Sequence, residues 1–321
     1  MSSKSLPQWF SYIESLHAKP MALGLERIAQ VAKKLRISKF HCPVITVAGT
    51  NGKGSCVAFL EAILLAAGYR VGAYTSPHLL RFNERIRIGG EEISDEQLIL
   101  LFQRVELARG DITLTYFEFT TLAALLYFKL LPLDALILEV GLGGRLDAVN
   151  CVEPDVAVIT TVALDHMDWL GTTREAIGFE KAGIFRRHCP AICGDLDPPK
   201  SVLAVAQELS VPLYCLGRDF NFTVMGSLWA WQHKAVSHDN LPMPALPVQN
   251  AATALMALQC LRGNITQRPE AVVAKRFLKQ SRFSGTDKHY KFYIATSAKN
   301  WIASKIVSQR RFIVSSTLMF S

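Results

Sequence analysis

The sequence predicts an α/β fold, a parallel β-sheet with helices packed on its faces. Short apolar runs bounded by turn residues recur along the chain, as is typical of strands buried on both faces. Helical patterns separate these runs. A glycine-rich loop joins the first predicted strand to the helix that follows it. Together these features predict a sheet built from successive strand, loop and helix units.

The first of these units follows an N-terminal helical region at Leu23–Leu35. The apolar run Pro43–Ala48 is rich in β-branched residues and predicts a strand. The helix Lys53–Ala67 begins directly after the glycines, and Arg70–Tyr74 is the next strand. This order predicts a βαβ unit.

Two further strands and a series of helices extend the predicted sheet. Asp134–Val140 and Asp155–Val162 are short apolar runs bounded by turn signals. The most apolar stretch, Leu122–Leu138, contains Lys129, Pro132 and Asp134, so it predicts a buried helix, a turn and a strand instead of a membrane span. The remaining helical patterns lie at 95–108, 117–131, 173–182, 200–209 and 248–261.

Composition places the chain among folded globular proteins. It has 321 residues, of which 50% are apolar and 19% charged, enough to bury a sizeable core. No basic and then apolar signal segment stands at the N-terminus, so we expect a cytoplasmic protein without a membrane partner, and a monomer. The seven cysteines include no CxxC pair, which favours reduced thiols over a disulfide framework or a zinc site.

The net charge of +8 comes from the C-terminal segment. Residues 1–261 hold 23 basic and 25 acidic residues, whereas residues 262–321 hold 12 basic and 2 acidic residues. A basic segment is one signature of nucleic-acid binding. This one lacks a recognised motif or interleaved aromatic residues, so we expect no nucleic-acid partner.

The glycine-rich loop, Gly49-Thr50-Asn51-Gly52-Lys53-Gly54-Ser55, predicts a phosphate-binding loop (P-loop) for ATP. Its backbone N–H groups and the helix N-terminus attract an anion, Lys53 reaches the β- and γ-phosphates, and the Ser55 hydroxyl can ligate Mg²⁺. The spacing departs from the standard motif, because Val47 replaces its first glycine and Gly54 separates the lysine from the hydroxyl. The alternative is a glycine-rich turn without a ligand.

Candidate metal ligands follow the predicted strands, at the sheet edge where open α/β sheets bind ligands. Glu139 ends an apolar strand, where a buried carboxylate needs either a metal ion or a basic partner such as Arg145. Ser76 and His166 follow two other strands. Taken singly, Ser76 would more often be part of a plain turn, and His166 would usually be a surface residue.

Two more polar features follow Glu139. The glycine-rich run 141–148 permits close approach of the backbone to a ligand and offers Arg145 and Asp147 as polar contacts, although a bare flexible loop is the alternative. Lys181 stands near a predicted helix end, where a lysine ordinarily does no more than interact favourably with the helix dipole.

Together these segments resemble the folylpolyglutamate synthase/dihydrofolate synthase family, ATP-dependent ligases related to the Mur ligases of cell-wall synthesis. The resemblance extends over about residues 1–262, and the phrases occur in the family order. Each phrase alone is weak, whereas the ordered set is specific. The matching phrases are Gly49–Ser55, Ser76–Leu79, Leu114–Glu118, Leu138–Ala148, Ala163–His166, Glu180–Phe185 and Asn250–Ala254.

The resemblance implies a role for each matching position. In the family, the positions of Ser55, Ser76, Glu139 and His166 hold magnesium, and that of Asn250 contacts ATP. The position of Lys181 is carbamylated and becomes an anionic ligand, and the loop from Ser76 is mobile. The resemblance implies catalytic roles for Lys53, His166 and Lys181. It implies dihydropteroate binding by Thr115, Tyr116, Phe117, Glu118, Leu146, Asp147 and Ala148.

The implied reaction is the addition of L-glutamate to dihydropteroate or to folates. ATP would convert the acceptor carboxylate to an acyl phosphate, which the glutamate amine attacks to give an amide, ADP and phosphate. A carboxylate is a poor acyl donor to amines until its oxygen becomes a good leaving group. Lys53 and Mg²⁺ would neutralise charge on the transferring phosphoryl group.

The C-terminal segment departs from the family pattern. We expect a Mur ligase-like central domain at 1–262, whereas 263–321 reads as a missing or degenerate small C-terminal domain, the product of truncation or a frameshift. The family's Pro-Gly-Arg-Phe phrase survives only as 280–283, with Arg282 as its ATP contact. Two alternatives therefore stay open: an inactive nucleotide-binding remnant, and a Mur-type ligase acting on cell-wall precursors.

Overall fold

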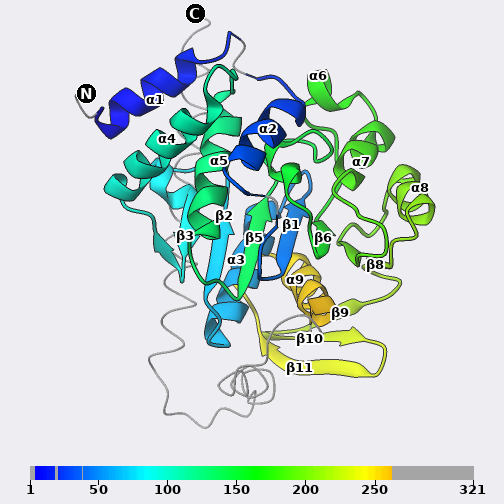
Figure 1. The fold of residues 1–321 in the computed structure, drawn as a ribbon. Helices are drawn as coiled ribbons and strands as arrows, with labels where there is room; N and C mark the ends of the chain where they lie inside the picture. The colour runs from blue at the N-terminus through cyan, green and yellow to red at the C-terminus, as the bar shows by residue number, and fades with distance from the viewer. Residues whose placement is uncertain (1–3, 19–20, 38, 262–321) are drawn as a thin grey trace, which may run out of the picture.

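A computed structural model describes residues 4–18, 21–37 and 39–261. Within them, β1 (Val44–Ala48) lies inside an eight-stranded sheet of order β4-β3-β2-β5-β1-β6-β7-β8 (Figure 1). The predicted C-terminal segment 263–321 and Arg282 lie outside the described residues. The other strands of this sheet are β2 (Val71–Tyr74), β3 (Ile86–Ile88), β4 (Glu91–Glu92), β5 (Ala135–Glu139), β6 (Val156–Ile159), β7 (Ala191–Cys193) and β8 (Leu213–Cys215).

The predicted parallel sheet is confirmed for its four predicted strands, β2, β5, β1 and β6, and it is extended by β7 and β8, which the sequence did not predict. These six strands pair in parallel, whereas β3 and β4 add an antiparallel edge. The predicted βαβ unit, from β1 through a helix to β2, is also present, and β5 lies between its two strands. Because the chain leaves β1 toward β2 and later continues on the other side through β6, the end of β1 is a switch point where such sheets bind ligands.

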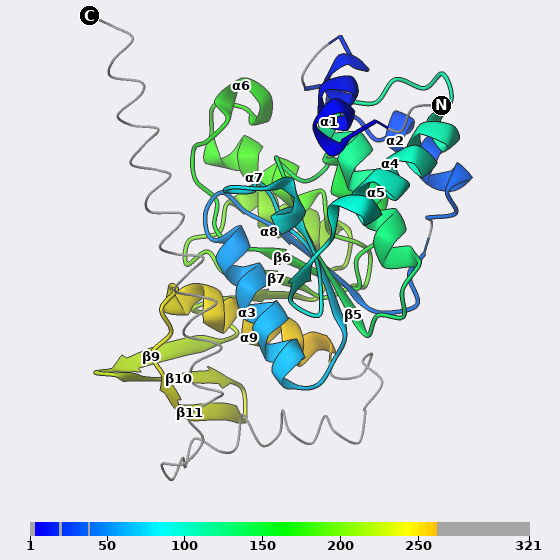
Figure 2. The ribbon, with the colours of Figure 1, turned by 90° about the vertical axis from the view of Figure 1, so that its left-hand side faces the viewer.

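Helices cover both faces of the sheet, as the alternation of side chains along the strands requires. Val44 faces a core with α2, α4 and α5, whereas its neighbour Ile45 faces a core with α3 and α9. Figure 2 shows α3 and α9 on the side of the sheet opposite α4 and α5. The bounds are α1 (Leu6–Ser15), α2 (Glu26–Lys34), α3 (Lys53–Ala66), α4 (Asp95–Arg109), α5 (Tyr116–Lys129), α6 (Met167–Leu170), α7 (Arg174–Ala182), α8 (Lys200–Glu208) and α9 (Val248–Leu261).

A three-stranded antiparallel sheet extends from the edge of the molecule beside α9 (Figure 1). It consists of β9 (Asn221–Met225), β10 (Leu228–His233) and β11 (Val236–Pro242). Trp231, which is buried, donates a hydrogen bond from Nε1 to the carbonyl of Ala252 at 3.1 Å. This sheet thereby supports α9, the helix that carries Asn250.

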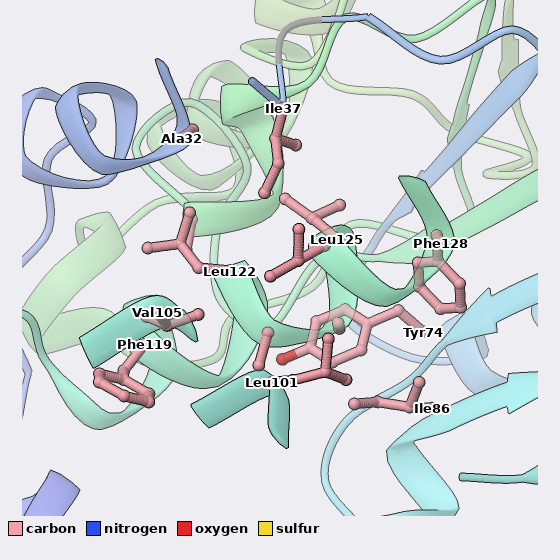
Figure 3. Packing of buried hydrophobic residues seen from close by; sticks show 14 of the residues in the cluster. Ala32, Ile37, Tyr74, Ile86, Leu101, Val105, Phe119, Leu122, Leu125 and Phe128 are labelled. Atoms are coloured by element: carbon pink, nitrogen blue, oxygen red, sulfur yellow. The ribbon is translucent and has the colours of Figure 1, made fainter. Parts of the chain in front are cut away.

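The apolar core beside α5 is tightly built from aliphatic and aromatic side chains. Figure 3 shows Tyr74 among Leu101, Leu125 and Phe128. The Tyr74 hydroxyl shares a hydrogen bond of 3.1 Å with the Thr121 hydroxyl, so its polar atom is satisfied inside the core. The stretch 122–138 forms the end of α5, a turn and β5, as predicted. Among the described residues, none of the helices has the length and apolarity needed to cross a bilayer.

A largely buried ion pair fixes the loop that follows β2 to α3. Arg87 on β3 donates to Glu61 on α3 at 2.7 Å, and its other terminal nitrogen donates to the Thr75 hydroxyl and to the Glu84 carbonyl. One guanidinium therefore joins the P-loop helix to both ends of the loop 75–84. That loop contains the predicted ligand Ser76.

We predict that Glu61→Ala destabilises the fold by about 3 kcal/mol, because removing one partner leaves the other charge buried and unpaired. Urea unfolding of the full chain measures the loss. The control is Arg81→Gln in the same region: its pair with Asp95 is exposed, at 62% and 50% of the two side chains, so it contributes under about 1 kcal/mol. Equal losses for the two variants would contradict the assigned role of the buried pair.

Candidate functional site

The predicted P-loop connects β1 to α3 at the centre of the sheet. Gly52 adopts φ +85° and precedes Lys53, the first residue of α3. The first turn of this helix leaves backbone N–H groups free of intrahelical acceptors, and its dipole favours an anion there. The strand-before, helix-after context predicted from the sequence is therefore present.

Hydrogen bonds hold this loop against the segment that follows β6. The Thr50 N–H donates to the Thr161 carbonyl at 2.7 Å, and the Thr50 hydroxyl both donates to the Ala163 carbonyl and accepts from the Ala163 N–H. The Thr160 hydroxyl donates to the Asn51 carbonyl at 2.6 Å. The loop is thus fixed from outside, before any ligand binds.

Gly49 is required by this close packing. It adopts φ +146°, and a Cβ placed on it would lie 1.9 Å from the Thr160 hydroxyl oxygen. Gly52 is restricted in the same way, because its added Cβ would lie 2.6 Å from Oδ1 of Asn250. The latter contact also places the side chain of Asn250, 6% exposed, directly against the loop.

A polar pocket opens beside the loop, and several of the predicted residues line it. Lys53 donates from Nζ to the carbonyls of Gly49 and Thr50, at 2.9 and 3.2 Å. His166 and Lys181 line the same pocket, which the structure completes with Gly49, Val140, Gly141, Leu142, Gly143, Asp165 and Leu170. The three predicted catalytic residues, Lys53, His166 and Lys181, are therefore brought to one place.

Lys181 differs chemically from an ordinary surface lysine. It lies at the end of α7 and is 3% exposed. Burial, and after it the positive charge of Lys53, lower its pKa to about 8, although Asp165 and Asp147 oppose the shift. At pH 8 a large fraction of this amine is therefore neutral and nucleophilic.

Glu139 lies at the carboxyl end of β5, buried, with the loop of Ser76 beside it. The Ser76 N–H donates to Oε2 of Glu139 at 3.2 Å. Arg145, the alternative partner considered from the sequence, pairs instead with Glu180 at 2.8 Å. The structure therefore brings Ser76 and Glu139 together.

The predicted metal set fits a hard divalent cation by chemistry. It comprises a buried carboxylate on Glu139, the hydroxyls of Ser55 and Ser76 and the imidazole of His166, of which the oxygens suit Mg²⁺ or Mn²⁺. Within the described residues no cluster of three or more His, Cys, Asp or Glu side chains is arranged as a metal site. The predicted metal set contains only two residues of these types, Glu139 and His166, and its other two ligands are the hydroxyls of Ser55 and Ser76.

In the segments implied to bind dihydropteroate, several polar side chains form hydrogen bonds and ion pairs within the protein. Thr115 caps α5: its hydroxyl accepts from the Glu118 N–H, and Glu118 Oε2 accepts from the Thr115 N–H. Glu118, which is buried, also forms an ion pair with Arg27 at 3.0 Å. Asp147 accepts from the N–H groups of Leu142 and Val149. Burial raises the pKa of Asp147 to about 6.

Aromatic side chains of the same segment face the glycine-rich run. Phe117 packs against Gly141 so closely that a Cβ there would lie 2.7 Å from its ring. Tyr116 contacts the ring of Phe82, with centroids 6.3 Å apart. Leu146 accepts a hydrogen bond from the Gly24 N–H at 3.4 Å, and Ala148 is buried.

The segment 21–27 was missed as a site element by the sequence reasoning. Its Gly24 contacts Leu146, and its Arg27 contacts Glu118 and donates to the Ala22 carbonyl at 2.8 Å. The segment therefore touches both stretches implied to bind dihydropteroate. In the sequence, the available signal was a glycine just before a helix. In the structure, a Cβ added at Gly24 would lie 2.9 Å from the Glu26 carboxylate.

Fold and site together define a Mur-ligase-type P-loop protein. The sequence matches the Mur ligase middle domain family over residues 47–218, more than half of the chain. This range includes the P-loop from Val47 onward, Glu139, His166 and Lys181, and ends after β8.

The chain belongs to the dihydrofolate synthase/folylpolyglutamate synthase family. It is 52% identical to the Escherichia coli K12 dihydrofolate synthase/folylpolyglutamate synthase over 258 residues, covering 80% of this chain and 61% of that protein. E. coli FolC in complex with DHPP and ADP superposes with a TM-score of 0.81, at 50% identity, over 85% of this chain and 65% of that one. A bifunctional enzyme with Mn, AMPPNP and L-glutamate bound gives 0.78 and 48%, over 89% and 67%.

The chain spans about 61% of the length of the E. coli protein and of the Haemophilus influenzae dihydrofolate synthase/folylpolyglutamate synthase. We therefore treat the activity of the complete relatives as a hypothesis for this chain.

We predict that Gly49→Ala destabilises the chain more than Gly68→Ala does. Both substitutions force alanine into a positive φ, which costs about 1–2 kcal/mol, but Gly68 has no atoms within 4 Å of the added Cβ. Only Gly49→Ala also forces the loop away from Thr160. Urea unfolding of both variants tests the difference, and equal midpoints would show that the contact is not restrictive.

Proposed function

We propose that this chain is an ATP-dependent carboxylate–amine ligase that adds L-glutamate to dihydropteroate and to folates. The observation that carries the proposal is the convergence of Lys53, His166 and the largely buried Lys181 on one pocket beside the P-loop. Two lysines face a pocket that borders an anion-binding helix N-terminus, an arrangement suited to a polyanionic nucleotide. The ligands of the similar structures, ADP, AMPPNP, DHPP and L-glutamate, support the same assignment.

In the proposed reaction the nucleotide phosphates bind at Gly49–Ser55, and Asn250 contacts the nucleotide from α9. Lys53 exchanges its hydrogen bonds to loop carbonyls for the β- and γ-phosphates and neutralises charge as the γ-phosphoryl group moves to the acceptor carboxylate. The glutamate amine then forms the amide bond to the acyl carbon, and phosphate leaves with the former carboxylate oxygen. The amine proton lost in this step passes to solvent or a nearby base.

Ser55, Ser76, Glu139 and His166 would hold a divalent cation, which we propose to be Mg²⁺. When bound, it would supply Lewis-acid stabilisation of the phosphate oxygens. The hydrogen bond from the Ser76 N–H orients the Glu139 carboxylate at the sheet edge. This ligand set, the substrate roles of 115–118 and 146–148, a cytoplasmic location and a monomeric state stay predictions.

Lys181 is proposed to become a carbamate. Its neutral Nζ would attack the carbon of CO₂, forming an N–C bond and releasing a proton. The product is an anion where a cation stood beside Lys53. Burial favours the modification in two ways, since it raises the neutral fraction of the amine and strengthens attraction between the new anion and Lys53.

We predict that Lys53→Ala abolishes ATP-dependent and dihydropteroate-dependent incorporation of labelled glutamate and weakens ATP binding by about 10–100-fold, the value of a charge-assisted contact. Lys34→Ala, at an exposed lysine on α2, is the matched control and should change neither quantity. Failure of the unmutated 321-residue chain to incorporate glutamate, while it binds ATP, would instead identify a nucleotide-binding remnant.

We predict that a carbamate on Lys181 forms with a midpoint near pH 8. Below that pH the amine is protonated and cannot attack CO₂, whereas an ordinary lysine of pKa 10.5 would be less than about 1% neutral at pH 8. NMR spectroscopy of the chain in ¹³C-labelled bicarbonate between pH 6 and 9 detects the carbamate carbon. Lys181→Arg should lack the signal, and persistence of the signal in that variant would place the carbamate elsewhere.

A further inference from the structure

Arg85 is a buried cation without a carboxylate partner in the part of the chain that the structure describes. Its relative exposure is 9%, the same as that of Arg109. Arg109 pairs with Glu106 at 2.6 Å, as a buried guanidinium is expected to do. For Arg85 the described residues supply no such ion pair. The contrast marks Arg85 as the exception among the buried arginines.

The interactions that Arg85 does make leave its terminal nitrogens available. Its Nε donates to Nδ1 of His78 at 2.9 Å, and its guanidinium lies 5.3 Å from the centre of the Phe82 ring. No described atom accepts a hydrogen bond from either terminal nitrogen. Neither nitrogen is among the fully enclosed polar atoms that lack a partner, so both remain accessible from solvent.

The neighbouring groups do not neutralise this cation. Glu84, the acid next to it in sequence, accepts from the backbone N–H groups of Leu79, Leu80 and Arg81. His78 accepts the hydrogen bond from Arg85 Nε at its Nδ1 and supplies no negative charge. A buried charge that lacks a counter-charge is costly, so a bound anion would relieve an existing cost.

Arg85 lies between two of the predicted site segments. It directly contacts His78, two residues beyond Ser76. On its other side, Phe82 contacts the ring of Tyr116, and the positive charge of Arg85 acts to lower the pKa of the Tyr116 hydroxyl. The cation therefore stands between the loop from Ser76 and the segment implied to bind dihydropteroate.

We infer that the terminal nitrogens of Arg85 bind a substrate carboxylate, with His78 orienting the guanidinium through its Nε. The planar fork of an arginine matches the two oxygens of a carboxylate. The inference rests on the proposed function, which supplies two sources of this group: the carboxylate of the acceptor and those of L-glutamate. In either case Arg85 determines which substrates enter, and it is distinct from the groups that bind phosphate.

The test uses the full chain with AMPPNP and three probes: dihydropteroate, its carboxamide analogue and L-glutamate. Calorimetry measures their Kd values for the unmutated chain, Arg85→Gln and Arg85→Lys. Arg81→Gln removes an equal charge four residues away, from an exposed pair, and is the matched control. Arg85→Lys retains the charge without the fork, and thermal melting of each variant verifies that it is folded.

We expect Arg85→Gln to raise the Kd of one carboxylate probe by about 10–100-fold, the effect of removing a hydrogen-bonded charge. The Kd of Arg85→Lys should lie between those of the unmutated chain and Arg85→Gln, and the Kd of Arg81→Gln should equal that of the unmutated chain. A loss confined to dihydropteroate, and absent for the carboxamide, assigns the acceptor carboxylate. A loss confined to L-glutamate assigns the incoming amino acid.

Three results would overturn the inference. These are Kd values within about twofold for all probes, equal losses for dihydropteroate and its carboxamide, and no binding of either carboxylate by the unmutated chain. The proposed function is judged separately by Lys53-dependent glutamate incorporation. If Arg85→Gln incorporates glutamate as well as the unmutated chain, the proposed function stands and the inference about Arg85 is wrong. If carboxylate binding depends on Arg85 but no glutamate is incorporated, the inference stands and the proposed function is wrong.

Discussion

The hydrogen bonds between the P-loop and the segment after β6 are the constraint on which the site depends. They depend on β1 and β6 being adjacent, because Thr50 and Asn51 bond to residues 160–163, directly after β6. On its other side β1 pairs with β5, which brings Glu139 to the same edge. The glycine at position 49 is the local condition for this arrangement, since any larger residue would overlap Thr160. A sheet order, a loop and a buried carboxylate thus follow from one set of contacts.

The charged groups of the site are arranged so that the proposed ligands would offset them. The charge of Lys53 contributes to the lowered pKa of Lys181 across the pocket, and Arg85 stands without a carboxylate among the described residues. On the other side, Glu139 is a buried carboxylate at a strand end. Phosphates, a carbamate and a substrate carboxylate would offset the first group, and a divalent cation the second.

The sequence predicted the parallel core well, because β1, β5 and β6 are continuous apolar runs and the glycines of the P-loop mark the turn unambiguously. It did not predict β3 and β4, which are three and two residues long and too short to show a period. It also missed β9 to β11, a sheet whose outer strands β9 and β11 contain no buried residue. For the site, spacing indicated candidates, whereas the hydrogen bond between Arg85 and His78, and the lack of a described carboxylate paired with Arg85, depend on how the folded chain brings residues together. No pattern along the chain records such contacts.

The segment Thr115–Glu118 illustrates how a matched motif divides between folding and binding. The side chains of Thr115 and Glu118 are occupied by the cap of α5 and by Arg27, which reaches back to the chain at Ala22. Neither group is free to recognise a ligand without breaking the start of the helix. If this segment binds dihydropteroate as proposed, recognition would fall to the groups that the cap positions, namely the aromatic faces of Tyr116 and Phe117 and the segment held by Arg27. A polar residue in a family motif can thus act on a ligand entirely through the geometry it imposes on its neighbours, and aromatic rings over a glycine backbone suit a planar substrate.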